Sequence, residues 1–344
     1  MRVYAYVDMD CFFAACEVKQ KPWLFDKPLI IGSTTNRGVV STANYHARAF
    51  GVHSAMPISQ ARALCKQGVF VKPQHRYYQQ ESQKIFSYLA QICDSYEARS
   101  IDEAILDITT LAQKKGWLGG AKYIRAFLFE KTGYTCSIGV ANSSRVAKMA
   151  SDHHKPSGIT VVKNHQAFLH PLAIEKIPGI GKKSISHYQE KGVYTIGDLA
   201  KKDIFWVMEH FGKHAYKYWF LATGNDRTGM SPYKKEKSIS HETTFDYDIS
   251  CQKTLVQTLH SLFEKTVDCP VTYRTISIKI RYDDFTTTLK QCTILPAKSD
   301  SVKQILTKLF FDFWNLRPVR LLGVKISHLS HSCDQQQYLD SYMV

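Results

Sequence analysis

The 344-residue sequence lacks the features of a membrane-spanning or disulfide-stabilised protein. No apolar run reaches the roughly 18 residues of a transmembrane helix. The nine cysteines are scattered without any C-x-x-C spacing, and an odd number cannot all pair within one chain. The first residues lead straight into a β-prone run and show no signal-peptide pattern. We therefore expect reduced thiols, no structural zinc, no membrane partner and a cytoplasmic protein.

Negative charge is also scarce. Lys and Arg number 45 against 30 Asp and Glu, which gives a formal net charge of +15. The excess is greatest in residues 1–165, which hold 21 basic and 12 acidic residues. Such an excess favours a polyanionic partner, first nucleic acid and second an anionic membrane. The alternative is an ordinary basic soluble protein.

Two short acidic stretches organise the N-terminal half of the chain. Residues 3–7 form an apolar, β-prone run that ends at Asp8 and Asp10, and residues 104–108 form a similar run that begins after Asp102 and Glu103. Buried strands do not normally carry unpaired carboxylates at their ends, because desolvating a charge is costly. If the two strands are neighbours, Asp8, Asp102 and Glu103 converge.

Convergent carboxylates repel each other unless a cation lies between them. Hard oxygen ligands without nearby His or Cys favour Mg²⁺, and a paired Mg²⁺ site is typical of phosphoryl transfer at nucleic acids. The alternative is that these acidic residues are solvated turn residues.

A possible polyphosphate grip follows in the sequence. Thr42, Tyr45 and Arg48 are spaced three residues apart, so they would share one face of a helix. A hydroxyl, a phenol and a guanidinium on one face suit a polyphosphate, because Arg binds phosphate bidentately. The alternative is a solvated helix face.

Residues 174–184 contain a helix-hairpin-helix pattern, with an apolar-Pro-Gly-apolar-Gly turn followed by lysines. Such a turn leaves backbone N–H groups at a helix N-terminus, where they bind a DNA phosphate without reading sequence. The residues concerned are Pro178, Gly179, Gly181, Lys182 and Lys183. The polar segment 225–240 reads as a linker whose lysines Lys234, Lys235 and Lys237 can follow a phosphate backbone.

Hydrophobic periodicity predicts an α+β chain of several domains. We expect helices at 77–96, 121–131, 143–150 and 302–314, and strands at 28–32, 38–42, 69–73, 135–141, 159–162, 272–282 and 319–329. Together with strands 3–7 and 104–108, the order is that of a split βαβ palm with an insertion at residues 11–74.

With these residues in place, the chain resembles the Y-family DNA polymerases of the DinB type from residue 1 to about residue 329. The matching motifs are V-D-M-D-C-F-F-A-A at 7–15, S-T-A-N-Y-x-A-R-x-F-G-V at 41–52, S-I-D-E-A at 100–104, G-V-A at 139–141, A-K-M-A-S-D at 147–152, K-P-x-G at 155–158 and I-P-G-I-G-K at 177–182.

The resemblance implies a right-hand polymerase fold and a template-directed, low-fidelity translesion DNA polymerase. The implied domains are a palm (1–10 and 75–165), fingers (11–74), a helix-hairpin-helix thumb (166–230), a linker (231–240), an α+β little finger (241–330) and a tail (331–344). The length leaves no room for a proofreading exonuclease. The implied partners of a monomeric enzyme are primer-template DNA and dNTPs.

The resemblance also implies roles for individual residues. Asp8, Asp102, Glu103 and the Met9 carbonyl would hold two Mg²⁺ ions. The triphosphate of the incoming nucleotide would be gripped by Thr42, Tyr45, Arg48 and Lys155. Phe13 would be the steric gate that excludes a ribose 2′-hydroxyl, whereas Phe12 reads as core.

The sequence departs from the family pattern at two places. Ser143-Ser144-Arg145 occupies a turn that often carries a lysine, which leaves open whether Arg145 replaces that charge. The tail segment 335–339 resembles a sliding-clamp peptide only loosely, and the alternative is a solvated end. Two other classes of protein are alternatives. One is a non-catalytic DNA-binding accessory protein, which the loss of any of the three carboxylates would favour. The other is a different palm enzyme, such as a nucleotide cyclase.

Overall fold

The structure is a computed structural model that describes residues 1–35, 37–231, 236–268, 271–294 and 299–331. The chain forms two compact units. The first comprises Met1–Ile31, Ser41–Ser54 and Cys65–Tyr233, and the second comprises Gly32–Val40, Ala55–Leu64 and Lys234–Val344. Parts of the predicted fingers therefore group with the C-terminal half, and the four-domain division stays a prediction.

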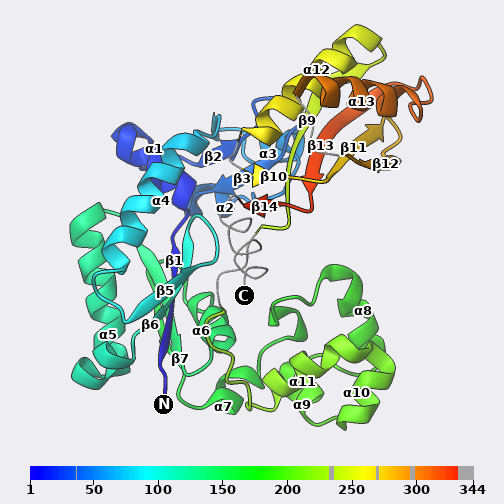
Figure 1. Cartoon of the computed structure of the whole chain (residues 1–344). Helices are drawn as coiled ribbons and strands as arrows, with labels where there is room; N and C mark the ends of the chain where they lie inside the picture. Colours follow the sequence, from blue (N-terminus) through cyan, green and yellow to red (C-terminus); the bar gives the residue numbers. More distant parts are fainter. Residues whose placement is uncertain (36, 232–235, 269–270, 295–298, 332–344) are drawn as a thin grey trace, which may run out of the picture. The chain divides into compact units, whose positions relative to one another are not determined.

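A five-stranded sheet with the order β5-β6-β1-β7-β8 forms the centre of the first unit (Figure 1). Its strands are β1 Tyr4–Met9, β5 Ser95–Ala98, β6 Glu103–Asp107, β7 Cys136–Ala141 and β8 Ile159–Val161. β1 is antiparallel to both β6 and β7, and Asp8 lies opposite Glu103 in the register. The two acidic stretches are thus on neighbouring strands, which is the condition under which Asp8, Asp102 and Glu103 were expected to converge.

The alternation of side chains along β1 divides the core of this unit between the two faces of the sheet. Ala5 and Val7 pack with the long helices α4 His75–Leu89 and α5 Thr109–Thr132, and with α1 Phe12–Gln20. Tyr4 and Tyr6 point to the other face, where α6 Ser144–Ser151 covers them. In Figure 1, α5 and α6 lie on opposite sides of the sheet.

The predicted helix at 77–96 is wrong at its C-terminal end. Helix α4 ends at Leu89, and Ser95–Ala98 forms the edge strand β5, paired with β6 from Ser95↔Asp107 to Ala98↔Ala104. Pairing with β6, which follows after a short connection, supplies hydrogen bonds that the helical pattern of this segment does not reveal when it is considered alone.

The predicted helical face carrying Thr42 is also wrong in part. A small sheet has the order β3-β2-β4, with β2 Leu29–Gly32, β3 Val40–Ala43 and β4 Val69–Val71. Thr42 therefore lies in a strand, and the short helix α2 Tyr45–Arg48 begins after it with Asn44 as its N-cap. The β-branched run preceding Asn44 favours a strand. Helix α3 Ile58–Leu64 lies further along the chain.

Short helices form the rest of the first unit. They are η1 Pro22–Leu24, α7 His165–Leu169, η2 Ile174–Lys176, α8 Lys182–Glu190, α9 Ile196–Ala200, α10 Ile204–Phe211, η3 Lys213–Ala215 and α11 Tyr216–Ala222. From α7 onward they share one core with Tyr4 and Tyr6 of β1.

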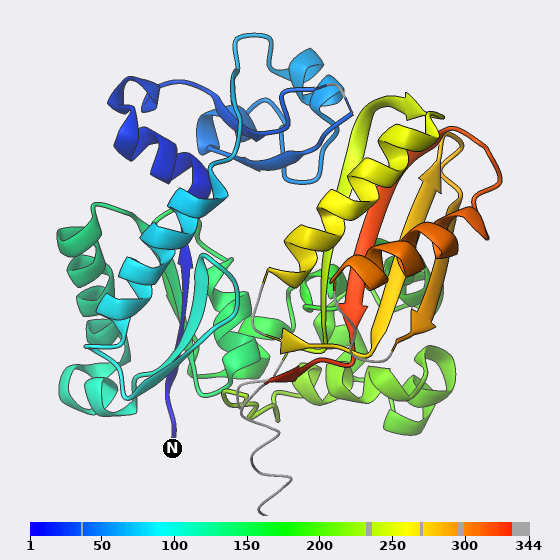
Figure 2. The same ribbon diagram turned by 45° about the horizontal axis from the view of Figure 1, so that its top comes forward.

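The second unit has a four-stranded antiparallel sheet with the order β12-β11-β13-β9. Its elements are β9 Ser238–Ile249, α12 Gln252–Val267, β10 Val271–Thr272, β11 Thr275–Tyr282, β12 Thr287–Thr293, α13 Ser299–Phe311, β13 Val319–Ser327 and β14 Ser330–His331. Both helices cover the same face of this sheet (Figure 2). β9 begins at Ser238, so residues 238–240 of the predicted linker belong to a strand.

Glu81, which is only 3% exposed, anchors a buried polar network in the first unit. Its carboxylate accepts hydrogen bonds from Lys84 Nζ at 2.7 Å, Tyr134 Oη at 2.8 Å and Lys19 Nζ at 2.9 Å. Burial raises the pKa of Glu81, but its bonds to Lys84, Lys19 and Tyr134 outweigh burial and bring it down to about 2.

We expect Glu81→Gln to lower the free energy of unfolding at neutral pH by about 2–3 kcal/mol. Because the pKa is depressed from its usual 4.5, the ionised carboxylate stabilises the fold above pH 4.5, and this stabilisation is lost as the pH falls through about 2. Urea unfolding at several pH values measures both effects, with the exposed Glu130→Gln as control. Equal stability of the two variants at neutral pH would contradict this account of the network.

Candidate active site

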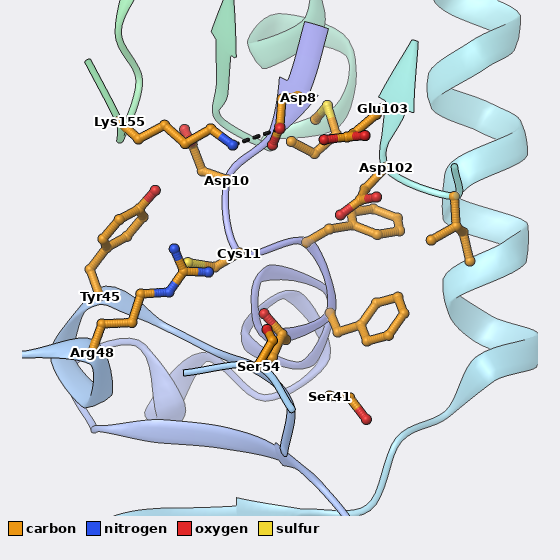
Figure 3. Close-up of a pocket in the computed structure, with 15 residues that line it drawn as sticks. Asp8, Asp10, Cys11, Ser41, Tyr45, Arg48, Ser54, Asp102, Glu103 and Lys155 are labelled. Atoms are coloured by element: carbon orange, nitrogen blue, oxygen red, sulfur yellow. Dashed lines mark hydrogen bonds and ion pairs between the residues drawn. The ribbon is translucent and has the colours of Figure 1, made fainter. Parts of the chain in front are cut away.

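A cavity of about 300 Å³ lies at the end of β1, entirely within the first unit (Figure 3). Its wall contains the predicted carboxylates, the predicted phosphate grip and Phe13. The lining residues include Asp8, Met9, Phe13, Thr42, Tyr45, Arg48, Asp102, Glu103 and Lys155. Segments separated by more than a hundred residues in sequence are thereby brought to one place, as predicted for these residues as a group.

The three carboxylates differ in their surroundings. Asp8 is 6% exposed, and burial raises its pKa, with contact to Glu103 adding to the rise. Burial also raises the pKa of Asp102, and the charge of Asp8 adds to it, although Ser100 Oγ donates a hydrogen bond to Asp102 Oδ1 at 2.5 Å. Burial raises the pKa of Glu103 as well, but its contacts with Asp8 and Lys148 outweigh it, and the pKa is lowered overall.

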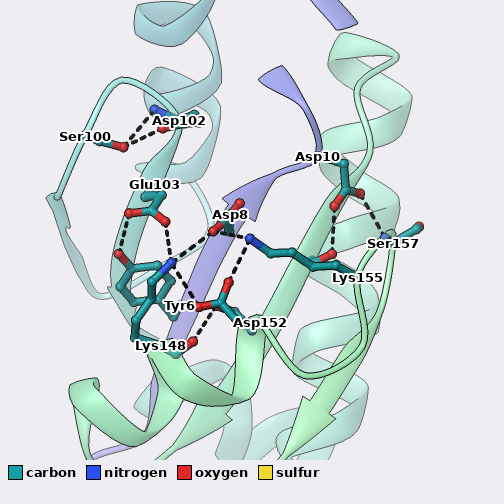
Figure 4. A network of polar contacts seen from close by, with 12 residues as sticks. Tyr6, Asp8, Asp10, Ser100, Asp102, Glu103, Lys148, Asp152, Lys155 and Ser157 are labelled. Atoms are coloured by element: carbon teal, nitrogen blue, oxygen red, sulfur yellow. Dashed lines mark hydrogen bonds and ion pairs between the residues drawn. The ribbon is translucent and has the colours of Figure 1, made fainter. Parts of the chain in front are cut away.

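Two lysine ammonium groups lie beside Asp8 (Figure 4). Lys155 Nζ is 2.6 Å from Asp8 Oδ2 and 2.8 Å from Asp152 Oδ1. Lys148 Nζ is 3.1 Å from the same Asp8 oxygen and also contacts Glu103 Oε1. Asp8 and Glu103 therefore have lysine partners, which is the pairing that burial demands.

The donor set of the cavity fits a hard divalent cation in its chemistry. Within the described part of the chain, no three Asp, Glu, His or Cys side chains already form a group that could hold a metal ion. However, Asp8, Asp102 and Glu103 supply only oxygen atoms, and the raised pKa values of Asp8 and Asp102 mark sites where a nearby cation would stabilise the ionised form. The metal-binding roles of these residues stay predictions.

Asp10, the second acid of the D-x-D pattern, has structural contacts instead. Its Oδ1 accepts a hydrogen bond from Ser137 Oγ at 2.8 Å, and its Oδ2 accepts one from the Ser157 backbone N–H at 2.9 Å. The carboxylate thus joins the end of β1 to β7 and to the turn that carries Lys155 (Figure 4).

The predicted phosphate grip lines the same cavity from several elements. Thr42 comes from β3, whereas Tyr45 and Arg48 come from α2. The Arg48 guanidinium lies 4.9 Å from the centre of the Tyr45 ring, and its Nε donates to the Ala43 carbonyl at 2.9 Å. These contacts orient an exposed guanidinium, whose remaining N–H groups face the cavity with Lys155 (Figure 3).

Phe12 and Phe13 have the different environments that the sequence predicted. Phe12 is 2% exposed and its ring lies 6.0 Å from that of Tyr134 in the core, although the residue also borders the cavity. Phe13 is partly buried, lines the cavity, and stacks on Tyr78 with ring centroids 4.4 Å apart. His75 meets the Phe13 ring edge-on at 5.9 Å, so the position of the ring is fixed from behind.

The hairpin between η2 and α8 exposes a helix N-terminus. Gly181 is the N-cap of α8 and provides no side-chain cap, and Lys182 and Lys183 are exposed in the first turn. Only one of the two glycines of this turn has a backbone conformation that favours glycine. Gly179 has φ +101°, and a Cβ there would lie 2.7 Å from Tyr218 Oη. Gly181 has φ −90° with open space around it.

We therefore expect the two glycines to respond differently to alanine. Gly179→Ala should destabilise this region by about 1–3 kcal/mol, because its backbone conformation is unfavourable for an L side chain. Gly181→Ala should preserve the melting temperature but weaken binding to every duplex sequence alike, because its methyl group would occupy open space through which a phosphate approaches the helix N-terminus. Melting curves and fluorescence anisotropy at fixed salt test both, and a sequence-dependent loss in Gly181→Ala would contradict phosphate-only contact.

The remaining predicted positions are Arg145, the three linker lysines and the tail segment. Arg145 Nη1 is 3.5 Å from Asp226 Oδ1, so this guanidinium has a carboxylate partner of its own. Lys237 is exposed just before β9. Lys234, Lys235 and the tail segment 335–339 lie outside the described residues.

Sequence reasoning missed two residues of the site, Lys148 and Tyr6. Lys148 contacts two of the three carboxylates, and Tyr6 Oη donates to Glu103 Oε2 at 2.8 Å. A signal for Tyr6 existed, because residues two apart on a strand share a face and Tyr6 precedes Asp8 by two. Lys148 stands within the motif at 147–152, but its direction depends on how α6 packs.

Carboxylates at the ends of neighbouring strands, facing basic and aromatic side chains, are typical of a nucleotidyl-transfer enzyme. Comparison with known proteins identifies the family of such enzymes. The impB/mucB/samB family matches residues 7–152, and the C-terminal domain of the same family matches residues 236–339. The chain is 37% identical to the DNA polymerase IV of Methanoculleus marisnigri, with 99% of this chain and 98% of the relative covered. It is 34% identical to the DNA polymerase IV of Listeria monocytogenes, with 95% of each covered.

Solved structures agree. A chimera of the Y-family DNA polymerases Dbh and Dpo4 gives a TM-score of 0.88 at 27% identity, covering 96% of this chain and all of the other. DinB from Sulfolobus solfataricus gives 0.64 at 27% identity, covering 94% and 98%. The chain belongs to the Y family of DNA polymerases, of the DinB or DNA polymerase IV type.

The chain is therefore a DNA-directed DNA polymerase of the translesion class. The α+β right-hand fold predicted from the sequence is confirmed. A divalent-metal requirement, two-metal phosphoryl transfer and the lack of proofreading are general features of this family. In the part of the chain that the structure describes, no helix is long and apolar enough to cross a membrane, and the cysteines described there are free.

Proposed function

We propose that this polymerase adds dNTPs to a primer 3′ end in the cavity at the end of β1, with two Mg²⁺ ions held by Asp8, Asp102, Glu103 and the Met9 carbonyl. The observation that carries the proposal is the common cavity: the three carboxylates line it together with Tyr45, Arg48, Lys155 and Phe13. When bound, the metal ions would neutralise charge and stabilise the attacking and leaving oxygens of an in-line displacement.

The side chains of the cavity would bind the other parts of the nucleotide. Arg48, Tyr45, Thr42 and Lys155 hold the triphosphate, and Arg48 is suited to grip two phosphate oxygens at once. Lys155 Nζ lies 2.6 Å from Asp8 Oδ2 in this structure, and Lys155 lines the same cavity as Arg48. Its ammonium group would turn from the carboxylate to a phosphate of the bound nucleotide. Phe13 presents the face of its ring to the sugar.

Primer-template DNA would lie along surfaces that carry no sequence information. The exposed N-terminus of α8, with Pro178, Gly179, Gly181, Lys182 and Lys183, would bind backbone phosphate. Lys234, Lys235 and Lys237 would add electrostatic attraction that is sensitive to salt. We further propose that the enzyme acts as a monomer in the cytoplasm, where free cysteines stay reduced.

The most direct test is primer extension with each dNTP on plain and damaged templates, with Mg²⁺ supplied or removed by chelation. Extension that depends on Mg²⁺ and on template sequence is expected. Duplex binding without extension under any metal would contradict the proposal and return the chain to an accessory role.

We also propose that the tail, through 335–339, binds a sliding clamp. Deletion of 334–344 should leave distributive synthesis unchanged and reduce synthesis when the cognate clamp is loaded on the primer-template. Product-length distributions with and without the clamp measure this. If the truncated and full-length enzymes respond equally to the clamp, the tail is only a solvated end.

A further inference from the structure

Tyr6 is a buried tyrosine whose hydroxyl is directed at a carboxylate of the active site. Its side chain is 5% exposed in the centre of β1, and Tyr6 Oη donates a hydrogen bond to Glu103 Oε2 at 2.8 Å. The ring of Tyr6 packs in a hydrophobic core, whereas its hydroxyl group meets a polar partner. Packing of the core therefore does not account for the hydroxyl group.

The sheet register explains how the two groups meet. Asp8 lies opposite Glu103, and Tyr6 lies opposite Ile105, in the antiparallel pair β1–β6. Tyr6 is therefore the diagonal neighbour of Glu103 on the same face, at a separation that a long aromatic side chain spans. Because the register is fixed by the buried faces of both strands, this contact is built into the sheet.

Lys148 completes the arrangement from the other side of the carboxylate. Its ammonium contacts Glu103 Oε1 and lies 4.8 Å from the centre of the Tyr6 ring (Figure 4). The two oxygens of Glu103 are thus held by different partners, and each retains a second lone pair for another ligand.

We propose that Tyr6 is a positioning residue, whose hydroxyl fixes the orientation of the Glu103 carboxylate for metal binding and nucleotidyl transfer. This inference rests on the proposed metal-binding role of Glu103. Partners of metal-binding carboxylates typically influence affinity or activity by about 10- to 100-fold, and Tyr6 occupies that position here. Tyr6 itself does not touch the substrate.

Tyr6→Phe removes only the hydroxyl, and Tyr4→Phe is the matched control. Tyr4 lies on the same strand and the same face, is 4% exposed, and shares its core with Tyr6. Mn²⁺ binding would be followed by electron paramagnetic resonance, with a dideoxy-terminated primer-template and the matching dNTP so that no turnover occurs. Single-turnover extension and melting temperatures would be measured on the same variants, with Glu103→Gln alongside.

Tyr6→Phe is expected to lower Mn²⁺ affinity and the extension rate about 10- to 100-fold, with the half-saturating dNTP concentration and melting temperature unchanged. Tyr4→Phe should match the wild type. Normal Mn²⁺ binding and extension in Tyr6→Phe, while Glu103→Gln fails in both, would overturn the positioning role and leave the metal site intact. Normal behaviour of Glu103→Gln would overturn the proposed metal site itself. Equal losses in both tyrosine variants, with lowered melting temperatures, would reduce the hydroxyl to a structural role.

Discussion

Asp102→Asn is expected to reduce primer extension by about a thousandfold or more, because losing one charged metal ligand removes several kcal/mol of transition-state stabilisation. Asp102 forms part of the cavity wall, and its raised pKa reflects burial and the charge of Asp8. Binding to primer-template should change little, because that affinity rests mainly on phosphate contacts elsewhere. Single-turnover extension and anisotropy binding measure the two quantities separately.

A control substitution that also removes the charge of one carboxylate is available in the first unit, outside the cavity. Asp94 is an exposed carboxylate that accepts a hydrogen bond from the Thr110 backbone N–H at 2.9 Å, next to the opposite end of β6. Asp94→Asn makes the same chemical change outside the cavity and should extend primers like the wild type. Robust extension by Asp102→Asn, or an equal loss in both variants, would refute the assignment of Asp102 to the metals.

Phe13→Ala is expected to raise ribonucleotide incorporation strongly while deoxynucleotide incorporation falls little. The ring of Phe13 lines the cavity and is fixed by stacking on Tyr78. A ribose would place its 2′-hydroxyl against this ring, and an unpaired buried hydroxyl alone costs about 1–3 kcal/mol. Since 1.4 kcal/mol corresponds to about tenfold, the ring should supply at least about tenfold discrimination, and steric overlap adds to it.

Phe12 provides the control for this substitution. Phe12→Ala truncates a fully buried core side chain and should lower the free energy of unfolding by about 3–5 kcal/mol without changing sugar preference. Incorporation of both nucleotide types is measured with both variants. An unchanged ribose preference in Phe13→Ala would mean that Phe13 is a core residue and that sugar selection lies elsewhere.

Strand pattern and motif together predicted much of the fold and site. β1 and β6 are marked by β-prone runs that end or begin in carboxylates, and the local sequence determines both features. Such features depend on local periodicity, which a sequence displays directly. The difference between Phe12 and Phe13 came instead from the family resemblance.

Features that depend on a partner element could not be predicted from the pattern of one segment alone. Residues 95–98 form a strand because β6 is beside them, although their own pattern continues a helix. The contacts of Asp10 could not be predicted either, because its carboxylate accepts hydrogen bonds from Ser137 and Ser157, which are far away in sequence. Lys148 required knowledge of how α6 packs on the sheet: a Cβ at Gly139 would lie 2.0 Å from the Ala147 carbonyl oxygen, so the helix lies directly on β7.

The two hydrogen bonds of Asp10 have a consequence for how separate parts of the site respond to substitution. They fasten the turn bearing Lys155 to the strand bearing Asp8, so that one cation of the grip and one acid of the metal site belong to a single rigid part. Tyr45 and Arg48 come from α2, a different segment of the sequence that is held by contacts of its own. Substitutions in α2 should therefore alter that part of the grip while the alignment of Lys155 with Asp8 is unchanged.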